Sequence, residues 1–196
     1  MRSPPPHPPD RQSIRLRGFD YTSSATHFVT ICVEDRQCVL GNITNGIMHA
    51  SPLGKIVADC WMTIPRIRPY VSLNEWIVMP NHIHGILTIM DHDRDSSPIW
   101  RVPYVSKQRT MTRRASHGDA PTCVAPTARL QPHSLGSIIG QFKIVTTKRI
   151  RAAGFADFAW QRNYFERIVR DDRAMENIRS YIRNNPAQWE RDRNNR

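Results

Sequence analysis

Two histidines separated by one residue, His82 and His84, have a spacing that suits metal binding. They begin the run HIHGILTIM (82–90), whose apolar and β-branched composition is typical of a strand. Alternate side chains of a strand share one face and lie roughly 6.6 Å apart along it. Two imidazoles so placed can converge on one ion at metal–nitrogen distances of about 2.1 Å. A His-x-His triplet alone has little specificity, because most such pairs are surface or structural histidines.

A second candidate pair lies in the segment YIRNNP, about a hundred residues further on. Tyr181 and Asn185 are four residues apart, one helical turn, so they project from the same side of a helix. A phenolic oxygen and an amide oxygen can then reach one site. The structural alternative is that Tyr181 packs beside an apolar stripe and Asn185 merely ends the helix before Pro186.

Together the two pairs indicate phosphodiester chemistry. Two imidazoles and one amide are neutral ligands, so a divalent ion would keep its full charge and open positions for phosphate oxygens. Such an ion stabilises the charge that develops in an in-line displacement. Tyr181 suits the role of nucleophile because its aryl phosphate is an activated ester, so the attack can be reversed without ATP. Tyr164 is the competing tyrosine, better explained as core or as a base-stacking platform. No residue stands out as the general base.

Hydrophobic periodicity predicts the elements that must position these side chains. Strands are expected at 25–33, 72–79, 82–90 and 163–169, and helices from Ser51-Pro52 to Pro65, from Ser134 to Gly154, and from Asp171 or Asp172 to about Asn184. Residues 41–50 are interpreted as a turn-rich connection. The order β-α-β-β-α-β-α predicts an α+β fold: a ferredoxin-like split βαβ antiparallel sheet with an additional C-terminal catalytic helix.

The domain organisation follows from length and composition. A chain of 196 residues is enough for one ordinary domain and too short for two large ones. We expect a proline-rich disordered tail at 1–13, a single domain at 14–190, and a basic tail at 191–196. Within the domain, residues 91–132 show no sustained apolar period, which predicts a long flexible loop.

The charge points to a polymeric anion as partner. The formal net charge is +11, and of the 28 basic side chains 24 are arginine and 4 lysine. Arginine presents a planar fork of donors that matches phosphate, and it stacks on flat rings. Charge kept only for solubility is the alternative. The arginines closest in sequence to the candidate site are the expected DNA contacts: Arg15, Arg17, Arg162, Arg167, Arg170, Arg179 and Arg183.

Several classes of protein are disfavoured. No apolar run approaches eighteen residues, so we expect no membrane-spanning helix, and the first residues lack the apolar stretch of a secretory signal. The four cysteines form no CxxC pair, which fits a reduced, cytoplasmic setting. A zinc hydrolase is disfavoured because there is no HExxH motif and no carboxylate at convincing ligand spacing.

With these motifs the sequence resembles the single-tyrosine transposases of the HUH superfamily, the insertion-sequence type, and particularly the REP-associated tyrosine transposases. The resemblance covers most of the chain outside 91–132 and rests on these stretches: IRLRGFDYTSSATHFVTICVEDR (14–36), WIVMPNHIHGILTI (76–89), LGSIIGQFKIVTTKRI (135–150) and WQRNYFERIVRDDRAMENIRSYIRNNPAQW (160–189). The His-hydrophobic-His triplet after MPN, combined with Y-x-x-x-N on a later helix, is its most specific part.

The resemblance implies roles for these residues. His82 and His84 correspond to the metal-binding pair, Asn185 to the third ligand and Tyr181 to the nucleophile. The cofactor would be Mg²⁺ or Mn²⁺, and the partner single-stranded DNA that carries a hairpin, cut to a 5′-phosphotyrosine and a free 3′-hydroxyl. Relatives include monomers and homodimers with exchanged helices, so both states stay open. The competing hypothesis is a non-catalytic or domesticated nucleic-acid-binding module.

Overall fold

The computed structural model describes residues 24–91, 132–192 and 194–195. In chain order its elements are β1 (Ala25–Cys32), η1 (Glu34–Arg36), β2 (Gly41–Thr44), β3 (Ile47–Ala50), α1 (Pro52–Met62), α2 (Ile64–Ile67), β4 (Val71–Met79), β5 (His82–Ile89), α3 (Leu135–Ala152), β6 (Phe165–Val169), α4 (Asp172–Asn184) and η2 (Pro186–Arg191). The expected tail 1–13, Arg15, Arg17 and residues 92–131 of the expected loop lie outside the described residues.

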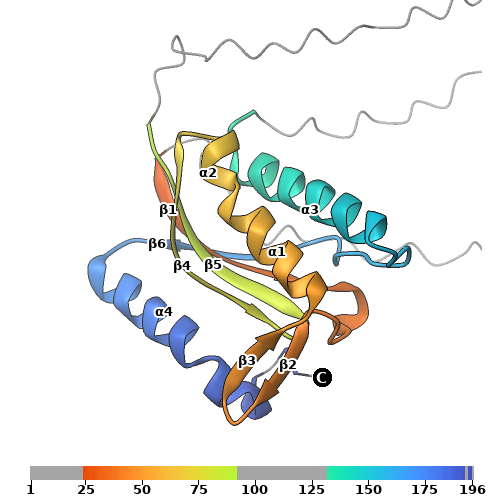
Figure 1. Ribbon diagram of the computed structural model, residues 1–196. Coiled ribbons are helices and arrows are strands. Elements are labelled where there is room, and N and C mark those ends of the chain that lie inside the picture. The colour runs from red at the N-terminus through yellow and green to blue at the C-terminus, as the bar shows by residue number, and fades with distance from the viewer. Residues whose placement is uncertain (1–23, 92–131, 193, 196) are drawn as a thin grey trace, which may run out of the picture.

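Four strands form an antiparallel sheet in the order β4-β5-β1-β6. Helices α1 and α3 cover one face of this sheet, and α4 lies on the other (Figure 1). The α+β, ferredoxin-like fold expected from the sequence is confirmed. None of the helices in the described residues is both long and apolar enough to cross a membrane.

Each of the three long helices begins at a polar cap. The side chains of Ser51, Ser134 and Asp171 accept hydrogen bonds from backbone N–H groups three residues on, in α1, α3 and α4. Such caps satisfy donors that have no partner inside the helix, typically worth about 1 kcal/mol. The starts of all three helices therefore agree with the sequence prediction.

The side chains of β5 alternate between the two faces of the sheet and contribute to two separate hydrophobic clusters. Ile83 and Leu87 point toward α1 and α3 and belong to a large cluster that includes Trp61. Ile86 points to the opposite face, where it packs with Phe28 and the apolar stripe of α4. Because strand side chains alternate with period two, His82 and His84 share the face of Ile86 and lie toward α4.

The interpretation of residues 41–50 as a turn-rich connection was wrong. They form the β2–β3 hairpin, joined by Asn45 and Gly46 with φ of 53° and 73°. A two-residue turn with positive φ at both positions matches the right-handed twist of its strands, and Asn-Gly favours it. The prediction that Pro65 ends the helical run was also wrong. Pro65 lies in the first turn of α2, where its missing N–H would have had no partner.

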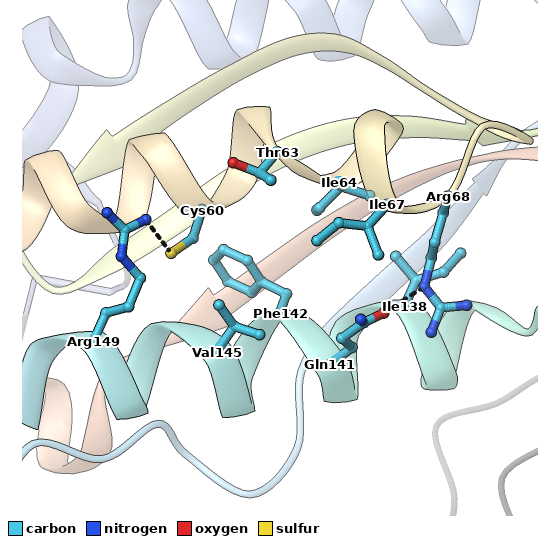
Figure 2. A pocket seen from close by; sticks show the side chains of 10 residues that line it. All are labelled: Cys60, Thr63, Ile64, Ile67, Arg68, Ile138, Gln141, Phe142, Val145 and Arg149. Atoms are coloured by element: carbon cyan, nitrogen blue, oxygen red, sulfur yellow. Dashed lines mark hydrogen bonds between the residues drawn. The ribbon is translucent and has the colours of Figure 1, made fainter. Parts of the chain in front are cut away.

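Hydrogen bonds join the helices behind the sheet. Arg68 Nε donates to Gln141 Oε1 at 2.7 Å, and Arg149 Nη1 donates to Cys60 Sγ at 3.3 Å. Figure 2 shows these arginines at the two ends of a small cavity of about 60 Å³ between α1, α2 and α3. This cavity lies on the side of the sheet away from the paired histidines, and the bonds across it hold the helix layer together.

Gly85 allows the helix layer to approach β5. A Cβ at Gly85 would lie 2.3 Å from Cζ2 of Trp61, a side chain with no exposed surface. We expect Gly85→Ala to lower the free energy of unfolding by about 1–3 kcal/mol, because the ring must shift within a packed core. Urea denaturation of Gly85→Ala, Trp61→Phe and the double variant measures this. Strictly additive effects would contradict the contact.

His27 makes the stability of the fold depend on pH. It is buried on β1, and burial lowers its pKa to about 4 from the ordinary 6.5. Between these values the unfolded chain binds more protons than the folded one, so stability falls as the pH drops. We expect this residue to cost about 2 kcal/mol at pH 5 relative to pH 7.5. Urea denaturation at both pH values should show a smaller loss for His27→Leu, and an equal loss would refute this role.

Candidate active site

The paired histidines lie on the central part of the sheet, where strand register holds them. His84 is opposite Thr30 of β1, and His82 is opposite Cys32. Both imidazoles are buried: His82 is 0% exposed and His84 is 1% exposed. Their Nε2 atoms face each other at 2.9 Å. The strand predicted from the sequence is therefore present, with both rings on one face and their Nε2 atoms in contact.

Asn81 determines the tautomer of His82. The Asn81 amide nitrogen donates to the carbonyls of Arg36 at 3.0 Å and Asn194 at 2.8 Å, so its Oδ1 is the atom that accepts from His82 Nδ1 at 2.7 Å. Burial lowers the pKa of His82 to about 4; the charge of Asp192 opposes this shift and that of Arg36 adds to it. The ring is therefore neutral near pH 7, and its Nε2 carries a lone pair.

His84 completes the pair. Its Nδ1 lies 2.8 Å from Oγ1 of Thr30, a hydroxyl that can accept as well as donate. Because the lone pair of His82 Nε2 faces His84 at 2.9 Å, His84 Nε2–H can donate to it while the Thr30 hydroxyl donates to Nδ1. When the His84 proton lies on Nδ1 instead, Thr30 accepts it and both Nε2 lone pairs are directed at one point, where a cation can bind. A hydrogen bond from the other ring nitrogen is the usual way in which proteins orient metal-binding histidines. The donor set fits a divalent metal ion.

Helix α4 brings Tyr181 to this pair. Ile178 and Ile182 anchor the helix on the sheet beside Phe28. The intervening turn then carries the Tyr181 hydroxyl to 3.2 Å from His84 Nε2, and the side chain remains 39% exposed. The tyrosine and the histidines of one chain therefore lie within contact distance of each other.

Asn185 lies one turn beyond Tyr181, as its spacing predicts. Its side chain is buried, and Nδ2 donates to Oδ2 of Asp192 at 3.0 Å. Among the described residues, Oδ1 of Asn185 accepts no hydrogen bond. A cavity of about 320 Å³ opens here, lined by Phe28, Thr30, His84, Tyr181, Asn185, Gln188, Arg191 and Asp192. A buried amide oxygen without a donor is a suitable metal ligand.

Asp192 is the site residue that sequence reasoning missed. One ligand atom each from His82, His84 and Asp192 lie within 4.8 Å of one another. The chain places this carboxylate in the segment expected to be a basic tail, more than a hundred residues from the histidines. Spacing along the sequence therefore carries no signal for it, and only the fold brings this carboxylate close to the paired histidines.

No family model matches this chain. An uncharacterized protein of Haemophilus influenzae is 35% identical to it over 182 residues, which cover 93% of this chain and 91% of that protein. The chain belongs to the family of this Haemophilus protein. Among solved structures, a REP-associated tyrosine transposase bound to a REP hairpin aligns with a TM-score of 0.55 and 18% identity, over 91% of this chain and 74% of that one. The likeness shows that the two share a fold, as the resemblance in sequence implied.

The predicted DNA-contacting arginines fall into two groups. Three are exposed on β6 and at its ends: Arg162, Arg167 and Arg170. The other two described arginines, Arg179 and Arg183, make polar contacts with side chains of the same protein. Arg179 donates to Asn74 at 2.9 Å, and Arg183 contacts Glu75 at 3.2 Å and Glu176 at 2.6 Å. The first group is the better supported anion-binding surface, because the carboxylates beside Arg183 offset its charge.

The competing Tyr164 lies on the other side of the sheet. It packs against the large hydrophobic cluster, and Lys143 Nζ lies 5.8 Å from the centre of its ring. Its neighbour Phe165 is on the opposite face, 6.3 Å from Phe28 between ring centres. Tyr164 is thus partly buried against the core, which was one of the two roles expected for it, and it serves as a matched control for Tyr181.

Metal binding to the paired histidines should raise the stability of the protein. We expect Mn²⁺ at about 100 times its dissociation constant to add about 2.7 kcal/mol, seen as a higher midpoint of thermal unfolding that EDTA reverses. His84→Ala should abolish the rise. His49→Ala, which removes an exposed histidine of β3, should preserve it. Equal stabilisation of His84→Ala and the wild type would place the metal elsewhere.

Proposed function

We propose that this chain is a metal-dependent endonuclease and strand transferase that acts on single-stranded DNA beside a hairpin. The proposal rests on one contact, the 3.2 Å between the Tyr181 hydroxyl and His84 Nε2. That contact joins a partly exposed phenol to a buried pair of imidazoles, an arrangement with no evident structural purpose. The shared fold with a transposase bound to a REP hairpin supports the choice of substrate.

His82, His84 and Asn185 would hold the ion, Mg²⁺ or Mn²⁺. The two imidazoles offer their Nε2 lone pairs, and Asn185 offers the amide oxygen that accepts no hydrogen bond among the described residues. When bound, a divalent ion supplies positive charge beside the phosphodiester as negative charge develops on it. The open side of the cavity leaves room for a phosphate next to these ligands.

Tyr181 would carry out the covalent step. Its phenolic oxygen forms a bond to phosphorus as the bond from phosphorus to the 3′ oxygen breaks. The phenolic proton passes to water in the open cavity, and the departing 3′ oxygen takes up a proton to become a hydroxyl. The product is a 5′-phosphotyrosine. Attack of a 3′-hydroxyl on this aryl ester restores the phenol and joins two ends, so no energy source is consumed.

The DNA strand would be held by charge and by flat rings near the site. The exposed Arg162, Arg167 and Arg170 lie on the β6 side of the sheet, on a chain whose formal net charge is +11. Phe165 is 38% exposed on the same strand and can stack on a base. Phosphate contacts of this kind provide affinity without reading sequence, so the identity of the hairpin must come from other contacts.

The covalent link offers a direct test. The protein is incubated with Mn²⁺ and a single-stranded DNA that bears a hairpin cognate for the chain, taken from DNA next to its gene, and is then run on a denaturing gel. We expect a DNA–protein adduct of increased mass in the wild type. Tyr181→Phe should form none, since it removes only the nucleophilic oxygen. Peptide mapping of the adduct should place the DNA on Tyr181.

Tyr164→Phe is the matched control, because it removes the same oxygen on the far side of the sheet and should leave adduct formation unchanged. An adduct that persists in Tyr181→Phe would overturn the assignment of the nucleophile. Tight binding of the hairpin with no adduct in the wild type would instead support the non-catalytic module.

A further inference from the structure

The carboxylate of Asp192 is held in a definite orientation at the candidate site. Its Oδ2 accepts from Asn185 Nδ2 at 3.0 Å, and its Oδ1 accepts from the backbone N–H of Asn194 at 2.6 Å. Two hydrogen bonds leave further lone pairs on the two oxygens. The same carboxylate lies with the ligand atoms of His82 and His84 inside a group no wider than 4.8 Å.

Asp192 also determines how the Asn185 amide is turned. A carboxylate only accepts hydrogen bonds, so the amide must turn its nitrogen toward Asp192. The amide oxygen is then directed away from Asp192, and it accepts no hydrogen bond among the described residues. The orientation that suits Asn185 as a ligand therefore depends on Asp192.

The chain returns to the site through a short folded segment. Pro186 is buried at the start of η2, and Ala187 lies against the tip of the β2–β3 hairpin, 3.4 Å from where a Cβ on Gly46 would be. At the far end the carbonyl of Asn194 accepts from Asn81, and its side chain accepts from Arg36 at 2.8 Å. The described part of this segment, residues 186–192 and 194–195, is thus fastened at both ends, with Asp192 between them.

We propose that Asp192 is a further ligand of the metal ion, in addition to His82, His84 and Asn185, and that the ion fastens residues 186–192 and 194–195 to the sheet. This rests on the proposed function only in requiring a metal at the paired histidines. A carboxylate lowers the net charge of the ion and its ligands and adds the oxygen donor that Mg²⁺ and Mn²⁺ prefer.

A purely structural role is the alternative. In that case Asp192 would serve as the hydrogen-bond acceptor that closes the turn before Asn194, and the ion would not contact it. The two roles differ in what they predict for metal affinity. Asp192→Asn keeps an oxygen that can accept from the Asn194 N–H, so it preserves the turn while it removes the charge. Its amide nitrogen would face Asn185 Nδ2 and turn that amide round, so the variant is compared both in the wild type and in an Asn185→Ala background, where only direct contact between Asp192 and the ion can still weaken binding.

The test is the affinity of the full chain for Mn²⁺, measured by the electron paramagnetic resonance signal of the free ion. We expect Asp192→Asn to weaken binding at least tenfold, with the midpoint of thermal unfolding in EDTA nearly unchanged. Glu190→Gln is the matched control, because it removes the same charge from an exposed position of the same segment and should bind like the wild type.

A second readout follows the segment itself. Hydrogen exchange of segment 186–195, followed by mass spectrometry, should slow when Mn²⁺ is added to the wild type, and in Asp192→Asn it should not change. Equal affinity of Asp192→Asn and the wild type, or unchanged exchange in the wild type at saturating Mn²⁺, would overturn the role of Asp192 and leave the histidine site intact. Absence of Mn²⁺ binding by the wild type would instead refute the metal site of the proposed function.

Discussion

Two buried imidazoles whose Nε2 atoms lie 2.9 Å apart are the constraint on which the site depends. Burial keeps the His82 ring uncharged by lowering its pKa to about 4, so its lone pair is available rather than protonated. The polar groups behind the rings, Asn81 and Thr30, hold their orientation. Free rings at a surface would rotate apart, whereas a central strand with partners on both sides keeps them together.

The rest of the fold supplies a rigid support for that strand and a separate carrier for the phenol. Behind the sheet, Trp61 lies against Gly85 and the arginines of α2 and α3 join the helices. In front, α4 contacts the sheet through a small apolar cluster that includes Ile178 and Ile182, and through polar contacts of Arg179 and Arg183 with β4. The histidines thus have a well-packed foundation, and Tyr181 lies on an element with a smaller apolar contact, which suits a residue that must reach a bulky DNA substrate.

Much of this arrangement could be predicted from the sequence. The order of strands and helices follows from local apolar periods, and the polar caps Ser51 and Ser134 mark where two helices begin. Strand alternation alone puts His82 and His84 on one face. The β2–β3 hairpin was not predicted because its strands have four residues each and are mostly exposed, so they show no apolar alternation. The Asn45-Gly46 turn was the one local signal for it. The predicted helix end at Pro65 was wrong because proline, which disrupts a helix interior, is accepted in the first turn of a new helix.

The sequence by itself determined the chemical types in the site and their local geometry: two imidazoles two residues apart on a strand, and a phenol one helical turn before an amide. Those relations are short-range, because backbone hydrogen bonds fix the period of a strand or a helix. Only the tertiary structure decided that α4 lies on the histidine face, that Tyr181 meets His84 of its own chain, and that Asp192 returns to the pair. Each depends on packing and on hydrogen bonds between segments distant in the chain, such as Asn81 with Asn194, and no local pattern records them.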